Sequence, residues 1–201
     1  MHLEKEGSIV KRHFTERIIW LAVTGVITGW SILMFVDGRS TKAFMGVLTI
    51  VSLLAIGFWQ RKAQKPFPPA FAVMTYVFIF IAVGLGTFGG AYSIHHFDDF
   101  LHVSSGIWIG YGAWIVLCHL LGEELKDKLP SSFIAFYLIA VALAVAGFWE
   151  LMEFAGDKLF HFTAQGRDPD DTMYDMIDGL IGGTVFAVFF VIKRGKKIKQ
   201  L

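Results

Sequence analysis

Carboxylate and histidine side chains gather at one end of three hydrophobic segments of this chain. The segments read IHHFDDFLHVSSG from Ile94, FWELMEFAGDKLFH from Phe148 and DPDDTMYDMIDGLIGG from Asp168, and together they hold ten of the 17 acidic residues. Ionisable groups at the rim of a bilayer are costly unless they pair, bind a cation or line a wet cavity. The segments therefore predict a polar site on a membrane protein.

Helical spacing would place the polar residues of each segment on one face. Residues three, four and seven apart lie on the same side of an α-helix. Three helices are thus expected to present one acidic or histidine-bearing face each. The faces are His95, Asp98 (or Asp99) and His102; Glu150, Glu153 and Asp157; and Asp171, Asp175 and Asp178.

The three faces also reach a similar depth. At about 1.5 Å per helical residue, His102 lies about 30 Å from Gly122, where its segment ends. Glu150 and Asp175 lie about 28 and 27 Å from the opposite ends of their segments by the same arithmetic. We expect these side chains to converge in one pocket just inside the outer boundary of the membrane.

The residue types in this pocket favour a divalent metal ion as cofactor. Several carboxylates cannot all stay ionised in a low-dielectric site without a cation, and otherwise some must hold protons. Mixed carboxylate and imidazole ligands suit zinc, manganese or iron, whereas oxygen ligands alone suit magnesium or calcium. In ligand type, these residues resemble the carboxylate-rich two-metal sites of helix bundles. The spacing of the residues matches those sites only in part. The expected metal ligands are Asp98, His102, Glu150, Glu153 and Asp175, with His95 and Asp178 as further candidates.

Asp171 or Asp157 is the expected general base. Two alternatives remain open for the same cluster. The carboxyl groups would share protons or line a wet ion path, or they would pair only to hold helices together.

The elements that position these residues are membrane-spanning helices. The 201 residues are 55% hydrophobic with a mean hydropathy of +0.57, which is atypical of a soluble domain. Six segments are long enough to cross about 30 Å of hydrocarbon, and only helices satisfy their own backbone groups there. We predict an all-α polytopic transmembrane bundle of six helices in a single membrane domain. Residues 1–17 would form a cytoplasmic N-terminal segment, residues 18–192 the bundle and residues 193–201 a basic cytoplasmic tail. The expected spans are 18–36, 43–59, 71–92, 101–121, 132–149 and 173–192.

Glycines and a helix start give two further expectations. Glycines four residues apart let helix backbones approach closely in lipid, and the pairs are Gly86 with Gly90, Gly106 with Gly110, and Gly179 with Gly183. Asp168 is expected to cap the last helix, with Pro169 in its first position.

Basic residues predict the orientation of the chain. With both termini in the cytoplasm, only Arg39, Lys42, Lys158 and Arg167 of the 18 lysines and arginines lie outside. This bias places the acidic cluster on the extracytoplasmic side. The net charge of +1 predicts no nucleic-acid partner.

Three stretches, read together, carry a family resemblance: Phe97-Asp98-x-x-x-His102 with Gly106, Trp149-Glu150-x-x-Glu153-Phe154, and Asp171-Thr172-Met173-x-Asp175-Met176 with Gly182. They resemble the uncharacterised YjdF-like family of bacterial inner-membrane proteins and, more faintly, the VanZ-like proteins. The resemblance implies a multi-pass protein of the bacterial cell (inner) membrane. Since that family has no settled activity, it supports the architecture and the site but no reaction.

The leading hypothesis is a metal-dependent hydrolase or transferase that acts on a lipid or lipid-carrier head group, with membrane lipids and a lipid-linked substrate as partners. A second hypothesis is a proton- or metal-ion-coupled transporter, although no internal repeat is visible. A third is a non-catalytic membrane factor in envelope stress or antibiotic tolerance, in which the cluster only ties helices together.

Overall fold

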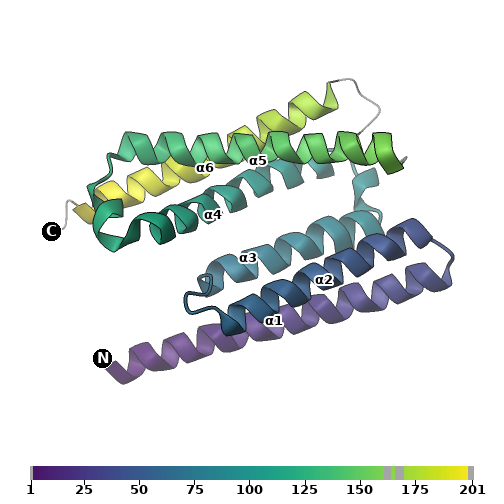
Figure 1. The fold of residues 1–201 in the computed structure, drawn as a ribbon, viewed down its shortest axis with the longest axis horizontal. Coiled ribbons are helices and arrows are strands. Elements are labelled where there is room, and N and C mark those ends of the chain that lie inside the picture. The colour runs from purple at the N-terminus through teal and green to yellow at the C-terminus, as the bar shows by residue number, and fades with distance from the viewer. Residues whose placement is uncertain (1, 161–163, 166–169, 199–201) are drawn as a thin grey trace. The chain divides into compact units, whose positions relative to one another are not determined.

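The computed structural model describes residues 2–160, 164–165 and 170–198, and most of these residues are helical, with no strand among them (Figure 1). Six of the described helices are long and apolar enough to cross a membrane. The predicted all-α fold with six spans is therefore confirmed. The chain divides into two compact units, Met1–Ile94 and His95–Leu201, which are described separately. The single six-helix bundle and the cytoplasmic termini stay predictions.

The first unit contains three spans. Helix α1 covers His2–Val36 and α2 covers Ser40–Lys62, while α3 (Pro69–Ile79) continues into the π-helix η1 (Phe80–Phe88). The short 3-10 helix η2 (Ala91–Ser93) follows. The third span ends at Phe88, before the expected residue 92, because Gly90 adopts a left-handed conformation (φ 78°) that turns the chain.

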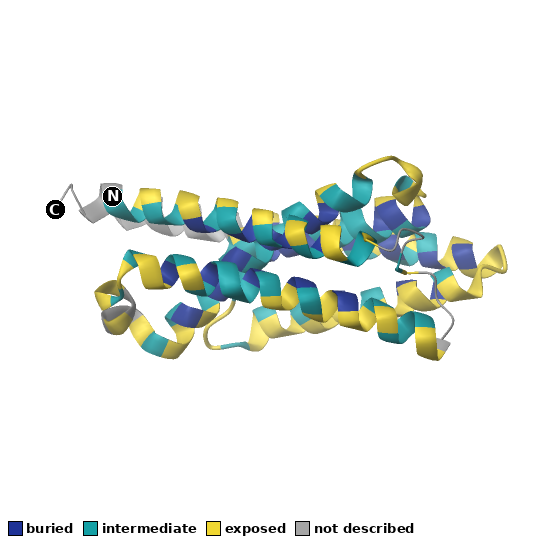
Figure 2. Cartoon of the chain, turned by 90° about the horizontal axis from the view of Figure 1, so that it is seen from above, coloured by how far each residue is buried: buried dark blue, intermediate teal, exposed yellow. Residues whose placement is uncertain are grey.

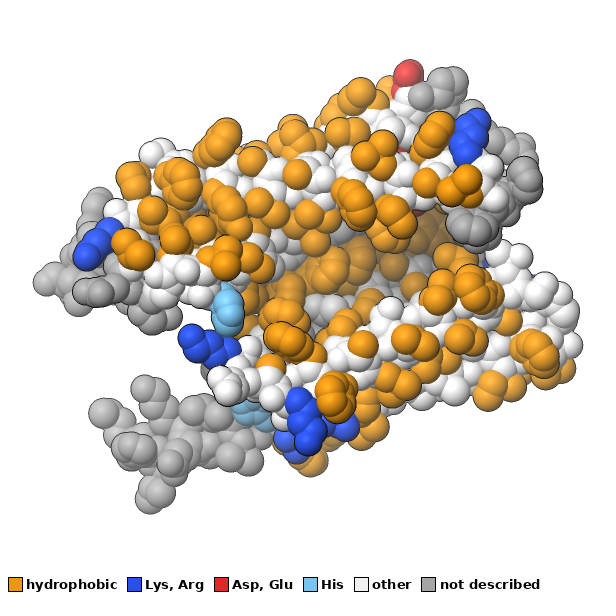
Figure 3. Space-filling view, viewed as in Figure 1, with side chains coloured by type: hydrophobic (Ala, Val, Ile, Leu, Met, Phe, Trp, Pro, Cys, Tyr) orange, Lys and Arg blue, Asp and Glu red, His pale blue; other side chains and the backbone are white. Residues whose placement is uncertain are grey.

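Each span of this unit buries a narrow stripe and exposes the rest. Ile27, Leu53 and Tyr76 are fully buried, and the Trp20 indole donates a 2.8 Å hydrogen bond to the Leu53 carbonyl oxygen. Other large apolar side chains, such as Phe35 at 76% exposure, remain outside this core. Figures 2 and 3 show the buried stripes and the hydrophobic side chains spread along the helices. Such exposed apolar surface is typical of helices that face lipid.

The second unit packs three long helices against one another: α4 (Phe97–Lys128), α5 (Ser131–Phe160) and α6 (Asp171–Ile198). The membrane span of α4 ends at Gly122, whose left-handed φ of 71° breaks the helix. All three helices extend beyond the expected spans at the acidic end, so the acids lie on regular helix. The expected cap, Asp168 with Pro169, lies outside the described residues.

Small residues bring these helices together. A Cβ atom on Gly106 of α4 would overlap the backbone of Gly179 on α6, and one on Gly182 would overlap the Val103 carbonyl group. On the α5 side, a Cβ on Gly179 would lie 2.7 Å from the Cβ of Ala146. The predicted close approach of these helices is confirmed, and we call the contact of Gly106 with Gly179 and Gly182 the glycine seam.

The glycine pair of the first unit behaves differently from the expectation. A Cβ on Gly86 would meet the Tyr92 ring, whereas Gly90 lies in a turn with nothing within 4 Å of such a Cβ. The prediction that Gly86 and Gly90 form a helix-packing pair is therefore wrong, because the helix ends between them.

Candidate metal centre

His102 of α4 lies between carboxylates from two helices. Its Nε2 atom is 3.7 Å from Asp98 Oδ1, one turn earlier on α4, and 3.7 Å from Asp175 Oδ1 on α6. His102 and Asp175 are 9% and 4% exposed, while the Asp98 side chain is 45% exposed. One ligand atom from each residue lies within 4.8 Å of the others. The three residues thus form a cluster with two buried donors and one half-exposed donor.

The spacing of these atoms suits a transition-metal ion. A metal bound at about 2.1 Å to nitrogen and oxygen in tetrahedral geometry holds its ligand atoms about 3.4 Å apart. The observed separations of 3.7 Å are a few tenths wider. Small side-chain movements would therefore bring His102, Asp98 and Asp175 onto a common ion. One imidazole with carboxylates favours zinc, manganese or iron.

A second group of carboxylates adjoins the first. Asp99, Asp175 and Asp178 also place one oxygen each within 4.8 Å of the others. Asp99 accepts a hydrogen bond from Nδ1 of His96, which has a left-handed φ of 62° immediately before α4 begins. Asp175 is the residue that the two groups share, and it is the buried carboxylate of the second group.

Glu150 of α5 lies near this cluster, although it belongs to neither ligand group formed by the described residues. It is 4% exposed, and its Oε1 atom has no hydrogen-bond partner among the described residues. The Thr172 hydroxyl hydrogen-bonds the same carboxyl group, and the charges of His102 and Asp98 act on it. A buried polar atom left without a partner costs about 1–3 kcal/mol. A cation beside Glu150 would remove that cost.

The other two acids of α5 are engaged elsewhere. Glu153 Oε1 accepts a 2.8 Å hydrogen bond from the Trp149 indole. Asp157 accepts two backbone N–H bonds from the connection to α6, at 2.8 Å from Ala164 and 3.2 Å from Gln165. Neither residue belongs to the ligand groups formed by the described residues. These contacts give Asp157 the geometry of a loop anchor, and its role as a general base stays a prediction.

His95 and Asp171 belong to neither ligand group formed by the described residues. His95 precedes α4 and is exposed, and its ring lies tilted against that of His96, with 3.6 Å between the ring centroids. The expectation that His95 shares a helix face with His102 is wrong, because α4 begins at Phe97 after the left-handed His96. Asp171 is half-buried in the first turn of α6, and its charge acts on Asp98 and Asp175.

Sequence reasoning gave no site role to three residues that hold these acids in place. Trp149 lies four residues before Glu153 on one helix, so helical spacing was a usable signal for that pair. His96 and Thr172 were harder to identify. The bond from His96 to Asp99 depends on an unusual backbone conformation, and Thr172 meets Glu150 only through the packing of α6 on α5.

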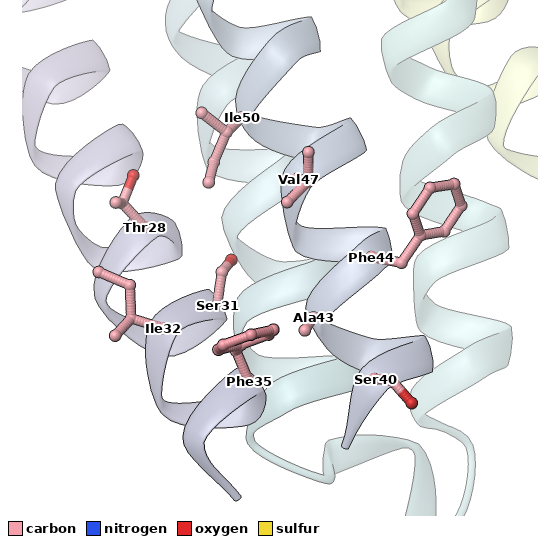
Figure 4. Close-up of a pocket in the computed structure, with 9 residues that line it drawn as sticks. All are labelled: Thr28, Ser31, Ile32, Phe35, Ser40, Ala43, Phe44, Val47 and Ile50. Carbon is pink, nitrogen blue, oxygen red and sulfur yellow. The ribbon is translucent and has the colours of Figure 1, made fainter. Parts of the chain in front are cut away.

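A cavity of about 450 Å³ lies in the first unit, between α1 and α2 (Figure 4). The hydroxyl groups of Thr28 and Ser31 in its wall donate to carbonyl oxygens of their own helix, and the wall contains no ionisable residue. The cavity therefore suits an apolar occupant and offers no groups for acid–base or metal chemistry.

Comparison with known proteins identifies the family of the chain and nothing further. A family model described as "Predicted membrane protein (DUF2238)" matches residues 17–196. This family is the one that the YjdF-like resemblance indicated, whereas the resemblance to VanZ-like proteins stays a prediction. No curated protein and no solved structure matches the chain.

Proposed function

We propose that this chain, which belongs to the DUF2238 family of predicted membrane proteins, binds a divalent cation at the extracytoplasmic end of α4, α5 and α6. We further propose that it uses the ion to hydrolyse or transfer a lipid head group. In this proposal Asp98, His102 and Asp175 bind the ion, and Glu150 completes its shell. The observation that carries the proposal is the position of His102 Nε2, which is equally distant from carboxylates of two helices.

The buried carboxyl oxygen of Glu150 is an independent argument for the ion. It lies on a third helix, and no described residue donates to it. Cations are strong partners for carboxylates that have been removed from water. A site that satisfies all of these acids with neutral donors would need more hydrogen-bond donors than His102 and Thr172 provide.

A bound divalent ion would polarise a phosphoryl or carbonyl oxygen and make a bound water a better nucleophile. Asp98 lies at the mouth of the centre with its side chain 45% exposed, so a head group would approach from that side. Asp171, half-buried beside Asp98, is the group placed to accept a proton from that water.

The packing beneath the centre argues against a carrier. An ion path between α4 and α6 would have to pass the glycine seam, where the backbones of these two helices touch. A transporter also needs helices that separate and close again during its cycle. Close backbone contact one turn below the ligands favours a fixed site that is reached from one side.

Metal analysis of the full chain in detergent tests the cation. After removal of metal and reloading with Mn²⁺ or Zn²⁺, we expect the wild-type protein to retain metal, and His102→Ala and Glu150→Gln to weaken binding by about 10- to 100-fold. Asp37→Asn is a matched control, because it removes an acid from the turn between α1 and α2. Gel filtration and thermal unfolding check that each variant is folded. Wild-type protein that binds neither ion at neutral pH would overturn the proposal.

Phosphorus NMR with phospholipid in mixed micelles tests the reaction. We expect a new phosphorus resonance that requires both the metal and His102. An unchanged spectrum from metal-loaded wild-type protein, across zwitterionic and anionic phospholipids, would overturn the enzymatic part of the proposal.

A further inference from the structure

We propose that Asp175 bridges two divalent cations, the first held with Asp98 and His102 and the second with Asp99 and Asp178. This inference rests on the proposed function and deepens it, since it assigns a second ion and a class of substrate to the same site. The two ligand groups each lie within 4.8 Å, and Asp175 belongs to both.

The two groups use neighbouring positions of α4, Asp98 and Asp99, beside Asp175 of α6. Asp98 and Asp99 are adjacent in the first turn of α4, and neighbouring residues on a helix point about 100° apart. Asp175 and Asp178 are three residues apart on α6 and share a face. Oδ1 of Asp175 lies 3.7 Å from His102 Nε2, and in this proposal the other oxygen of the carboxylate binds the second ion.

The balance of charge leaves room for more than one divalent ion. Within the part of the chain that the structure describes, Asp98, Asp99 and Asp175 form ion pairs only with His96 and His102. The buried Glu150 adds a further carboxylate whose Oε1 no described group satisfies. Two divalent ions supply four positive charges to a site that these acids and Asp178 would otherwise leave strongly negative.

The two positions differ in donor chemistry and in access. The first offers one nitrogen and buried oxygen, which suits zinc, manganese or iron. The second offers only oxygen, and the Asp99 side chain is 49% exposed, so its ion should bind more weakly and exchange faster. Manganese accepts both kinds of donor set and is therefore the probe of choice.

Paired ions also fit a phosphate ester as the substrate. Two ions about 3.5–4 Å apart stabilise the attacking and leaving oxygens of an in-line displacement at phosphorus. In hydrolysis, a bond forms from the water oxygen to phosphorus as the bond from phosphorus to the head-group oxygen breaks. The proton lost by the water ends on the leaving alcohol. The inferred substrate is a phosphorylated head group at the membrane surface.

Manganese titration of the full chain in detergent, followed by metal analysis and electron paramagnetic resonance, tests the inference. We expect two ions per wild-type chain and a spectrum of exchange-coupled Mn²⁺. Asp99→Asn and Asp178→Asn should each bind one ion with an uncoupled six-line spectrum, while Asp37→Asn should match the wild type. Thermal unfolding confirms that the variants are folded.

The outcomes separate this inference from the proposed function. One ion per wild-type chain, unaffected by Asp99→Asn and Asp178→Asn, would overturn the bridged pair and leave the cation site in place. Two coupled ions that persist in both variants would overturn the assignment of the second group. A wild-type chain that binds no ion would overturn the inference together with the proposed function.

Discussion

Gly106 of α4 and Gly179 of α6 touch through their backbones, since a Cβ on Gly106 would overlap the Gly179 carbonyl oxygen. Each glycine lies four residues, or about one turn, after a member of the candidate centre, His102 and Asp175 respectively. The glycine seam therefore fixes the distance between the two helices directly below the ligands. The geometry of the centre depends on residues that carry no side chain.

Gly106→Leu should push α4 away from α6 and separate His102 from Asp175. We expect a loss of about 1–3 kcal/mol in the free energy of unfolding, typical of overpacking, together with weaker Mn²⁺ binding. Thermal unfolding in detergent and metal titration measure the two effects. Gly29→Ala on α1 is the control, since a Cβ there meets nothing within 4 Å, and it should lower neither quantity. Normal metal affinity in a folded Gly106→Leu protein would contradict the role of the seam.

Tyr76→Phe should destabilise the first unit. The Tyr76 hydroxyl donates a 3.3 Å hydrogen bond to Glu16 Oε1, and both residues are buried, at 0% and 5% exposure. Removing the donor leaves a buried carboxylate with a weaker set of partners, at a cost of about 1–3 kcal/mol. Tyr174→Phe, which alters a side chain that is 57% exposed, is the matched control in the same thermal unfolding assay. Equal melting temperatures for the two variants would contradict this account.

Asp157→Ala separates an anchoring role from a chemical one. The carboxylate of Asp157 accepts backbone N–H bonds from Ala164 and Gln165, and each such bond contributes about 1 kcal/mol. We expect a lower melting temperature with an unchanged number of bound Mn²⁺ ions. If the variant instead keeps its melting temperature and loses metal, Asp157 is a ligand rather than an anchor.

Cysteine labelling should confirm the orientation of the chain. Cys118 is the one cysteine of the sequence, so a Cys118→Ala background accepts single reporter cysteines. An impermeant maleimide applied to intact cells should label Asp37→Cys, and it should label Lys65→Cys only after the membrane is opened. This result follows from the distribution of lysine and arginine. The reverse pattern would place the candidate metal centre in the cytoplasm.

The sequence was sufficient to predict the spans and the acidic faces of α4 and α6, because both depend on local spacing. The pairs Asp98 with His102 and Asp175 with Asp178 follow from helical periodicity alone. The contact between α4 and α6 was also predictable from the sequence. The glycines that let these helices touch lie one turn from His102 and Asp175.

The features that periodicity missed depend on backbone conformation or on distant contacts. His95 left the predicted helix face because His96 turns the chain at a φ of 62°, which spacing rules do not detect. Asp157 followed the periodicity of α5 and yet binds the connection to α6, since local backbone donors compete for any carboxylate near a helix end. The Tyr76 bond to Glu16 spans 60 residues and exists only through the packing of α3 on α1.

Two helices begin at the candidate centre, with Asp98 in the first turn of α4 and Asp171 in the first turn of α6. Each helix start carries about half a positive charge from its peptide dipoles. The polypeptide backbone therefore offsets part of the repulsion among these acids by itself. The folded protein can persist in its metal-free form, and a chelator should empty the centre reversibly rather than denature the chain.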